Sequence, residues 1–159
     1  MLRKGILVPI LLTALLPASH ARADKGGPPH THQLSAGEPG DPKKPARVVE
    51  VVMRESGGKM MFAPNRIEVR RGDQIRFVIR NAGELEHEFV LATKTENHKH
   101  AEEMRKNPDM EHDDPNMTRV AAKKSGEIVW RFTRRGTFEF GCLIPGHYEA
   151  GMFGAVIVK

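Results

Sequence analysis

The chain has 159 residues, a formal net charge of +5 and a single cysteine. Residues 1–23 contain three basic residues and no acid, so the charge of +5 falls to +2 for residues 24–159. In that remainder, lysines and arginines are interleaved with acids, which argues against the concentrated basic face of a nucleic-acid-binding protein. One cysteine also excludes a disulfide within the chain.

The first 23 residues have the pattern of an export signal. Arg3 and Lys4 precede an apolar run from Gly5 to Leu16, and Ala21-Arg22-Ala23 fits a small-x-small cleavage motif. The apolar run is shorter than the ~20 residues that a transmembrane helix needs. We therefore expect a signal peptide (1–23) cleaved after Ala23, a periplasmic protein and no membrane span.

The rest of the chain divides into a lead and one domain. Residues 24–46 are rich in Gly and Pro without apolar periodicity, which predicts a flexible lead. Residues 47–159 have the size of a single domain. Strand patterns there run, in chain order, over 47–56, 65–83 (two strands around a turn at 71–73), 87–93, 126–133, 136–142 and 153–159. Short strands separated by turns predict an all-β fold, a Greek-key β-sandwich or barrel.

A polar insert at 94–119 interrupts these strands. It predicts a short helix over 96–105 that ends before Asn107-Pro108. Thioether and imidazole groups suit Cu(I), so the insert holds candidate secondary copper-binding residues: His98, His100, Met104, Met110, His112 and Met117. His30 and His32 in the lead are further candidates. The alternative is a polar loop whose methionines pack over the edge of the sandwich.

The single cysteine lies in a C-x4-H-x4-M pattern formed by Cys142, His147 and Met152. Because one strand ends at Cys142 and the next begins at Phe153, a single loop carries all three side chains. A thiolate, an imidazole and a thioether suit copper, and a type 1 copper site needs a second histidine. His87, at the start of a strand, is the candidate. Alternatives are an inert buried cysteine, or zinc, which prefers several cysteines and rarely takes a thioether.

These segments resemble the cupredoxins, the small copper proteins that include azurin and plastocyanin. The resemblance rests on "FAPNRIEVRRGDQIRFVIRN", on "LEHEF" and on "GTFEFGCLIPGHYEAGM". It implies one type 1 copper ion with the ligands His87, Cys142, His147 and Met152. The x4/x4 spacing is similar to that of azurin, but Glu88 stands where azurin and plastocyanin have asparagine. The narrower resemblance is to the CopI-type periplasmic cupredoxins of bacterial copper tolerance.

Two functions follow as expectations. The first is copper tolerance or sequestration in the periplasm by a redox-active copper protein. The alternative is electron transfer to a periplasmic redox partner, docked on an apolar surface around His147 that includes Leu143, Ile144, Pro145 and Met152. We expect a monomer that binds copper ions. We expect no enzyme, because Cys142 lies between Gly141 and Leu143 rather than between the flanking histidines of multicopper oxidases, and no nucleophile-and-base pair is evident.

Overall fold

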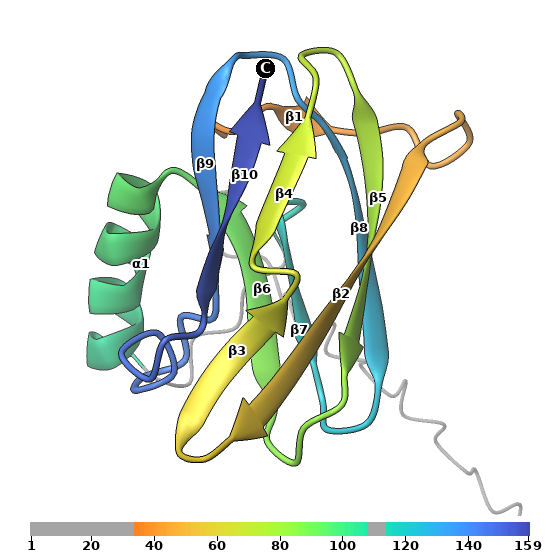
Figure 1. The fold of residues 1–159 in the computed structure, drawn as a ribbon. Helices are drawn as coiled ribbons and strands as arrows, with labels where there is room; N and C mark the ends of the chain where they lie inside the picture. Colours follow the sequence, from red (N-terminus) through yellow and green to blue (C-terminus); the bar gives the residue numbers. More distant parts are fainter. Residues whose placement is uncertain (1–33, 108–113) are drawn as a thin grey trace, which may run out of the picture. The chain divides into compact units, whose positions relative to one another are not determined.

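The computed structural model describes residues 34–107 and 114–159, which form two five-stranded sheets with one helix beside them (Figure 1). The first sheet has the order β1 (Glu38–Pro39), β8 (Ser125–Arg131), β5 (Gln74–Asn81), β2 (Arg47–Ser56) and β3 (Lys59–Ala63). The second has the order β4 (Arg66–Val69), β10 (Phe153–Val158), β9 (Gly136–Gly141), β6 (His87–Ala92) and β7 (Met117–Val120). The predicted all-β sandwich is confirmed.

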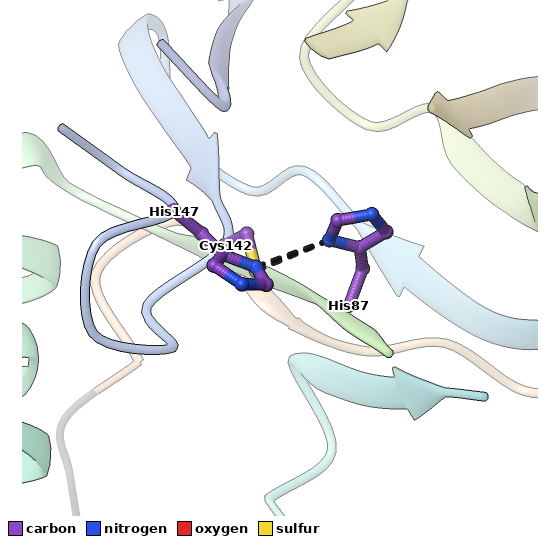
Figure 2. Close-up of side chains that lie close together, drawn as sticks. All are labelled: His87, Cys142 and His147. Atoms are coloured by element: carbon purple, nitrogen blue, oxygen red, sulfur yellow. Dashed lines mark hydrogen bonds between the residues drawn. The ribbon is translucent and has the colours of Figure 1, made fainter. Parts of the chain in front are cut away.

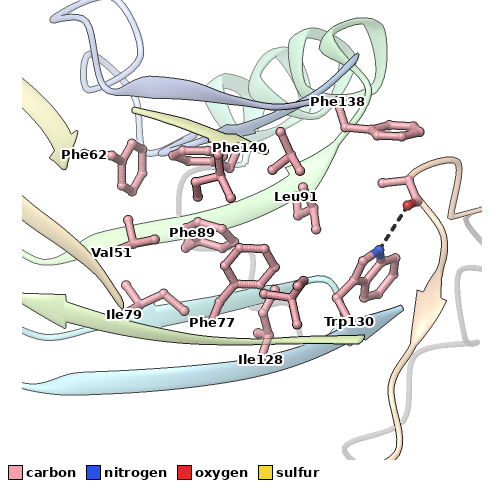
Figure 3. Packing of buried hydrophobic residues seen from close by; sticks show 14 of the residues in the cluster. Val51, Phe62, Phe77, Ile79, Phe89, Leu91, Ile128, Trp130, Phe138 and Phe140 are labelled. Carbon is pink, nitrogen blue, oxygen red and sulfur yellow. Dashed lines mark hydrogen bonds between the residues drawn. The ribbon is translucent and has the colours of Figure 1, made fainter. Parts of the chain in front are cut away.

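The core between the sheets follows from the alternation of apolar residues along the strands. On β5, Ile75, Phe77 and Ile79 are fully buried, while the residues between them are only partly covered. An aromatic contact joins the two sheets: Phe89 of β6 contacts Phe77 of β5 with centroids 5.4 Å apart, and it also stacks on Phe140 of its own sheet at 5.1 Å (Figure 3). This packed core gives the ligand-bearing strand ends a rigid support.

The predicted strand pair at 65–83 is present, but its two strands belong to different sheets. β4 pairs in parallel with β10, and β5 pairs in parallel with β2. The chain crosses between the sheets at a tight turn, where Asp73 N–H donates to the Arg70 carbonyl at 3.0 Å. Gly72 in this turn has φ +95°, a conformation that glycine adopts without the steric cost of a Cβ.

Part of the expected flexible lead is ordered. Residues 34–46 pack against the first sheet: β1 pairs antiparallel with β8, Ala36 is buried, and its carbonyl accepts a hydrogen bond from Trp130 Nε1 at 3.1 Å (Figure 3). The domain therefore begins before Arg47, because a buried indole N–H needs an acceptor and the lead supplies it. The predicted signal peptide and the candidates His30 and His32 lie outside the described residues.

The described residues of the polar insert form a helix, where the sequence predicted one over 96–105, and a strand. Helix α1 (Lys94–Lys106) begins at Thr93, whose side chain forms a capping box with Glu96. It packs on β6 and β9 of the second sheet (Figure 1). The insert then ends in β7, which pairs with β6. In the part of the chain that the structure describes, no helix has the length and apolar character needed to cross a bilayer.

Helix α1 covers a second, smaller hydrophobic cluster on this side of the sheet. The cluster consists of Val90, Met117 and Leu143, with Ala101 and Tyr148 packed against it. Leu143 and Tyr148 come from the loop that carries Cys142 and His147. The insert therefore supports that loop from outside the sandwich.

Candidate metal centre

Three donor side chains from two strand ends and one loop meet at one end of the sandwich (Figure 2). His87 is the first residue of β6, Cys142 directly follows β9, and His147 lies in the loop before β10. The Cys142 Sγ atom lies 3.3 Å from His147 Nδ1 and 4.0 Å from His87 Nδ1. The two Nδ1 atoms are 3.1 Å apart. Residues 60 positions apart in sequence thus converge on one point.

The spacing of these donors fits a metal ion. Bonds of about 2.0–2.3 Å to nitrogen and sulfur, as zinc makes, place trigonal donors about 3.5–3.8 Å apart. The observed separations of 3.1–4.0 Å bracket that range. One thiolate with two imidazoles is the equatorial donor set that copper prefers in a type 1 site. Within residues 34–107 and 114–159, no other group of three His, Cys, Asp or Glu side chains comes together in this way.

The loop between β9 and β10 is closed by its own backbone hydrogen bonds. Cys142 N–H donates to the Met152 carbonyl at 3.0 Å, and Met152 N–H donates to the His147 carbonyl at 3.2 Å. Gly146 and Gly151 have φ of +89° and +98°, so the two turns that shape the loop need glycine. The Met152 side chain is fully buried. The three predicted ligands of this loop are therefore held together by main-chain contacts.

The Cys142 thiol is buried and protonated in the copper-free protein. Burial raises its pKa to about 12, against the effect of hydrogen bonds from the backbone N–H groups of Glu88 and Ile144. The Glu88 N–H lies 3.3 Å from Sγ. Because this donor is a backbone group, the glutamate found in place of asparagine leaves the hydrogen bond to sulfur intact. A metal ion must displace the thiol proton to bind.

The two histidines differ in exposure. His87 is fully buried, and its Nε2 lies 2.7 Å from Glu55 Oε1. His147 is half-buried. Burial, together with the neighbouring His87, lowers the pKa of His147. The lowered pKa favours the neutral imidazole, which is the form that binds a metal.

Two acidic side chains lie next to the centre, and only one of them, Glu88, was singled out from the sequence. Burial alone would raise the pKa of Glu55. Hydrogen bonds from the backbone N–H groups of Leu85 and Glu84 and from His87 outweigh this effect and lower the pKa to about 2. The Glu88 carboxylate is fully buried and accepts hydrogen bonds from Arg119 Nη2 at 2.6 Å and Nε at 3.0 Å. Glu55 reaches the centre from β2 of the other sheet, so no local pattern marks it. Glu88 stood out only as the residue after His87.

Among the insert candidates that the structure describes, neither histidine belongs to this cluster. His98 is exposed on α1 and its Nε2 lies 3.1 Å from the Tyr148 hydroxyl. Met104 is fully buried and Met117 is 9% exposed, as expected for the packing alternative. His100 also lies on α1, whereas Met110 and His112 lie outside the described residues.

The fold and the cluster of one cysteine with two histidines define the class: a copper-binding protein of the cupredoxin type. A sequence model described as copper binding proteins, plastocyanin/azurin family, matches residues 49–159, and the chain belongs to this family. The copper-resistant cuproprotein CopI of Rubrivivax gelatinosus is 50% identical over 168 aligned positions, which cover 99% of this chain and 100% of that protein.

Two further similarities agree with this assignment. A protein of the same name from Pseudomonas aeruginosa is 34% identical over 157 positions, which cover 80% of this chain and 84% of that protein. The solved structure of auracyanin B superposes with a TM-score of 0.63 at 26% identity, covering 78% of this chain and 96% of that chain. The expected cupredoxin resemblance and the expected copper cofactor are confirmed.

Proposed function

We propose that the protein binds one copper ion in a type 1 centre and contributes to copper tolerance in the periplasm by sequestering copper. The ligands in this proposal are His87, Cys142 and His147, with Met152 as the axial ligand. The observation that carries it is the buried Cys142 thiol, with the Nδ1 atoms of two imidazoles at 3.3 Å and 4.0 Å from its sulfur. The copper-resistance names of the relatives support the role in tolerance.

The chain's own residues prepare the centre before copper arrives. The sandwich holds Cys142 and His87 at the ends of neighbouring strands, because β9 pairs with β6. Burial keeps water from the thiol, and the Glu88 N–H stabilises the thiolate once the proton has left. Copper, when bound, supplies a one-electron Cu(II)/Cu(I) couple.

A copper titration of the protein from residue 24 onward tests this function. We expect intense visible absorption that saturates at one equivalent of copper, and we expect Cys142→Ser to abolish it. A Cys142→Ser variant that keeps the absorption would overturn the ligand assignment. Colourless uptake beyond one equivalent would assign additional binding to exposed donors such as His98, because Met104 and Met117 are buried in this structure.

Electron transfer is the second candidate, and the exposure of His147 favours it. His147 is half-buried and Pro145 beside it is exposed, so an electron has a short path from the centre to a partner. The apolar docking surface around His147 is smaller than the sequence predicted, because the side chains of Leu143 and Met152 are buried. A strain that lacks the protein separates the candidates. Copper sensitivity with normal respiration favours sequestration, whereas a respiratory defect at low copper favours electron transfer.

We further propose that the protein has no catalytic activity of its own. Across the described residues, the cluster of Cys142 with His87 and His147 is the one group of three His, Cys, Asp or Glu donors within metal-binding distance. A copper oxidase that reduces oxygen fully must collect several electrons, and one mononuclear centre stores one. Oxygen consumption by the copper-loaded protein with a phenolic reductant, above that of free copper, would contradict this proposal.

A further inference from the structure

The carboxylate of Glu55 touches a proposed copper ligand from the opposite sheet. Glu55 lies near the end of β2, and its Oε1 is 2.7 Å from His87 Nε2. A carboxylate only accepts hydrogen bonds, so the hydrogen on this imidazole must be at Nε2. The lone pair is then at Nδ1, the atom that faces Cys142 Sγ.

We propose that Glu55 is a positioning residue of the copper centre, which sets the tautomer and orientation of His87 and stabilises Cu(II) relative to Cu(I). This inference rests on the proposed type 1 site. A carboxylate that accepts a hydrogen bond from a ligating histidine fixes the ring and makes it a stronger donor. A glutamate is ordinarily ionised at neutral pH, and its negative charge favours the more positive state of a nearby ion.

The structure holds this carboxylate by more than the histidine. The loop before β6 wraps around it: Glu84 N–H donates to Oε2 and Leu85 N–H donates to Oε1, both at 3.0 Å. A Cβ atom at Gly83 would overlap both carboxylate oxygens, so glycine is needed there to leave room for Glu55. The carboxylate therefore sits in a fitted position rather than in a chance surface contact.

The other side of the same loop is tied down as well. Asn81 is buried, its Oδ1 accepts from Gly83 N–H at 2.9 Å, and its Nδ2 donates to the Leu85 carbonyl at 2.7 Å. The loop is thus clamped between Asn81 and Glu55 immediately before His87. It leaves the imidazole little freedom to turn away from the centre.

The hairpin that carries Glu55 also contacts the second ligand-bearing loop. Glu55 pairs with Met60 across β2 and β3, and Met60 N–H donates to the Ala150 carbonyl at 3.2 Å. Ala150 lies between His147 and Met152. One hairpin of the first sheet therefore braces both segments that supply the proposed ligands.

The test compares Glu55→Gln with the matched control Glu50→Gln. Glutamine keeps the size of the side chain and removes its charge. Glu50 lies on the same strand but is exposed and pairs with Arg80 at 3.3 Å. For Glu55→Gln we expect Cu(II) affinity about 10- to 100-fold weaker and a smaller loss for Cu(I). Each tenfold decrease in the ratio of Cu(II) affinity to Cu(I) affinity raises the reduction potential by about 59 mV. The control should match the native protein.

Two measurements keep the proposal open to refutation if Glu55→Gln folds poorly. Nitrogen-15 shifts of His87 in the copper-free native protein should show hydrogen at Nε2 and none at Nδ1. Gly83→Ala, whose methyl group displaces the carboxylate, should shift the potential in the same direction as Glu55→Gln.

Hydrogen at Nδ1 of His87, or a Glu55→Gln potential equal to that of the control, would overturn the role of Glu55. A native protein without a coloured one-copper centre would instead refute the proposed function. The two failures are therefore distinguishable.

Discussion

Replacing Arg119 by methionine should destabilise the copper-free protein, because it leaves the Glu88 carboxylate buried without its counterion. The Glu88 side chain is 0% exposed, and its Oε1 accepts both hydrogen bonds from Arg119. Oε2 has no hydrogen-bond partner among the described residues. The substitution removes both bonds to Oε1, and no bond to Oε2 is there to compensate. Breaking a buried pair costs about 3–5 kcal/mol. Since the Arg119 side chain is 36% exposed and partly screened, we expect a loss of about 2–3 kcal/mol.

Urea unfolding of the copper-free protein measures this loss through the fluorescence of the single tryptophan, Trp130, which is fully buried. The unfolding midpoint and slope give the free energy of unfolding. Arg131→Met is the matched control, because it breaks an exposed pair with Glu38 at 3.3 Å and should cost less than about 1 kcal/mol. Adding Glu88→Gln to Arg119→Met should restore part of the stability.

Equal losses for Arg119→Met and Arg131→Met would refute the reasoning that the Glu88 charge is costly when unpaired. Strict additivity in the double variant would refute it as well, since two residues in contact should show a coupling energy. Performing both measurements without copper separates the ion pair from any effect on metal binding.

Three further predictions concern the centre and the core. Copper binding at neutral pH should release about one proton from Cys142, because a pKa of about 12 keeps the thiol protonated beforehand. A pH-stat titration counts the released protons, and no release would contradict a thiolate ligand. Gly154→Ala should cost about 1–3 kcal/mol in urea unfolding, because the added Cβ would overlap the Phe140 ring; an unchanged midpoint would refute this. The pKa of Glu55 lies near 2 in the folded protein and at 4.5 ordinarily, so its contribution is present above about pH 4.5 and is lost as the pH falls toward 2. Copper-free Glu55→Gln should therefore lose less stability than the native protein over that range, and equal losses would contradict it.

Local patterns in the sequence predicted the class of the fold and the donor set of the centre. Alternation along β5 marked Ile75, Phe77 and Ile79 as core residues, because successive strand side chains point to opposite faces. The x4/x4 spacing placed three donors in one loop, and the antiparallel pairing of β9 with β10 confirms that loop. These features are readable because they depend on neighbours in the chain.

The assignment of strands to sheets needed the tertiary structure. β4 and β5 are separated by a short turn, yet they lie in different sheets, since each finds a parallel partner distant in sequence. The sequence did not predict β7, which lies in the polar insert. Its pairing with β6 and the packing of α1 over it, rather than its own composition, make this segment a strand.

The side chains that surround the donors could also be identified only from the tertiary structure. Glu55 is 32 positions from His87, and Arg119 is 31 positions from Glu88. Contacts at such separations leave no periodic trace, because they depend on how the two sheets stack and where each strand ends. The sequence by itself determined which atoms are available to hold copper. The tertiary structure decided which carboxylates lie next to the donors and what they pair with, because only the packing of the two sheets brings these groups within hydrogen-bond distance.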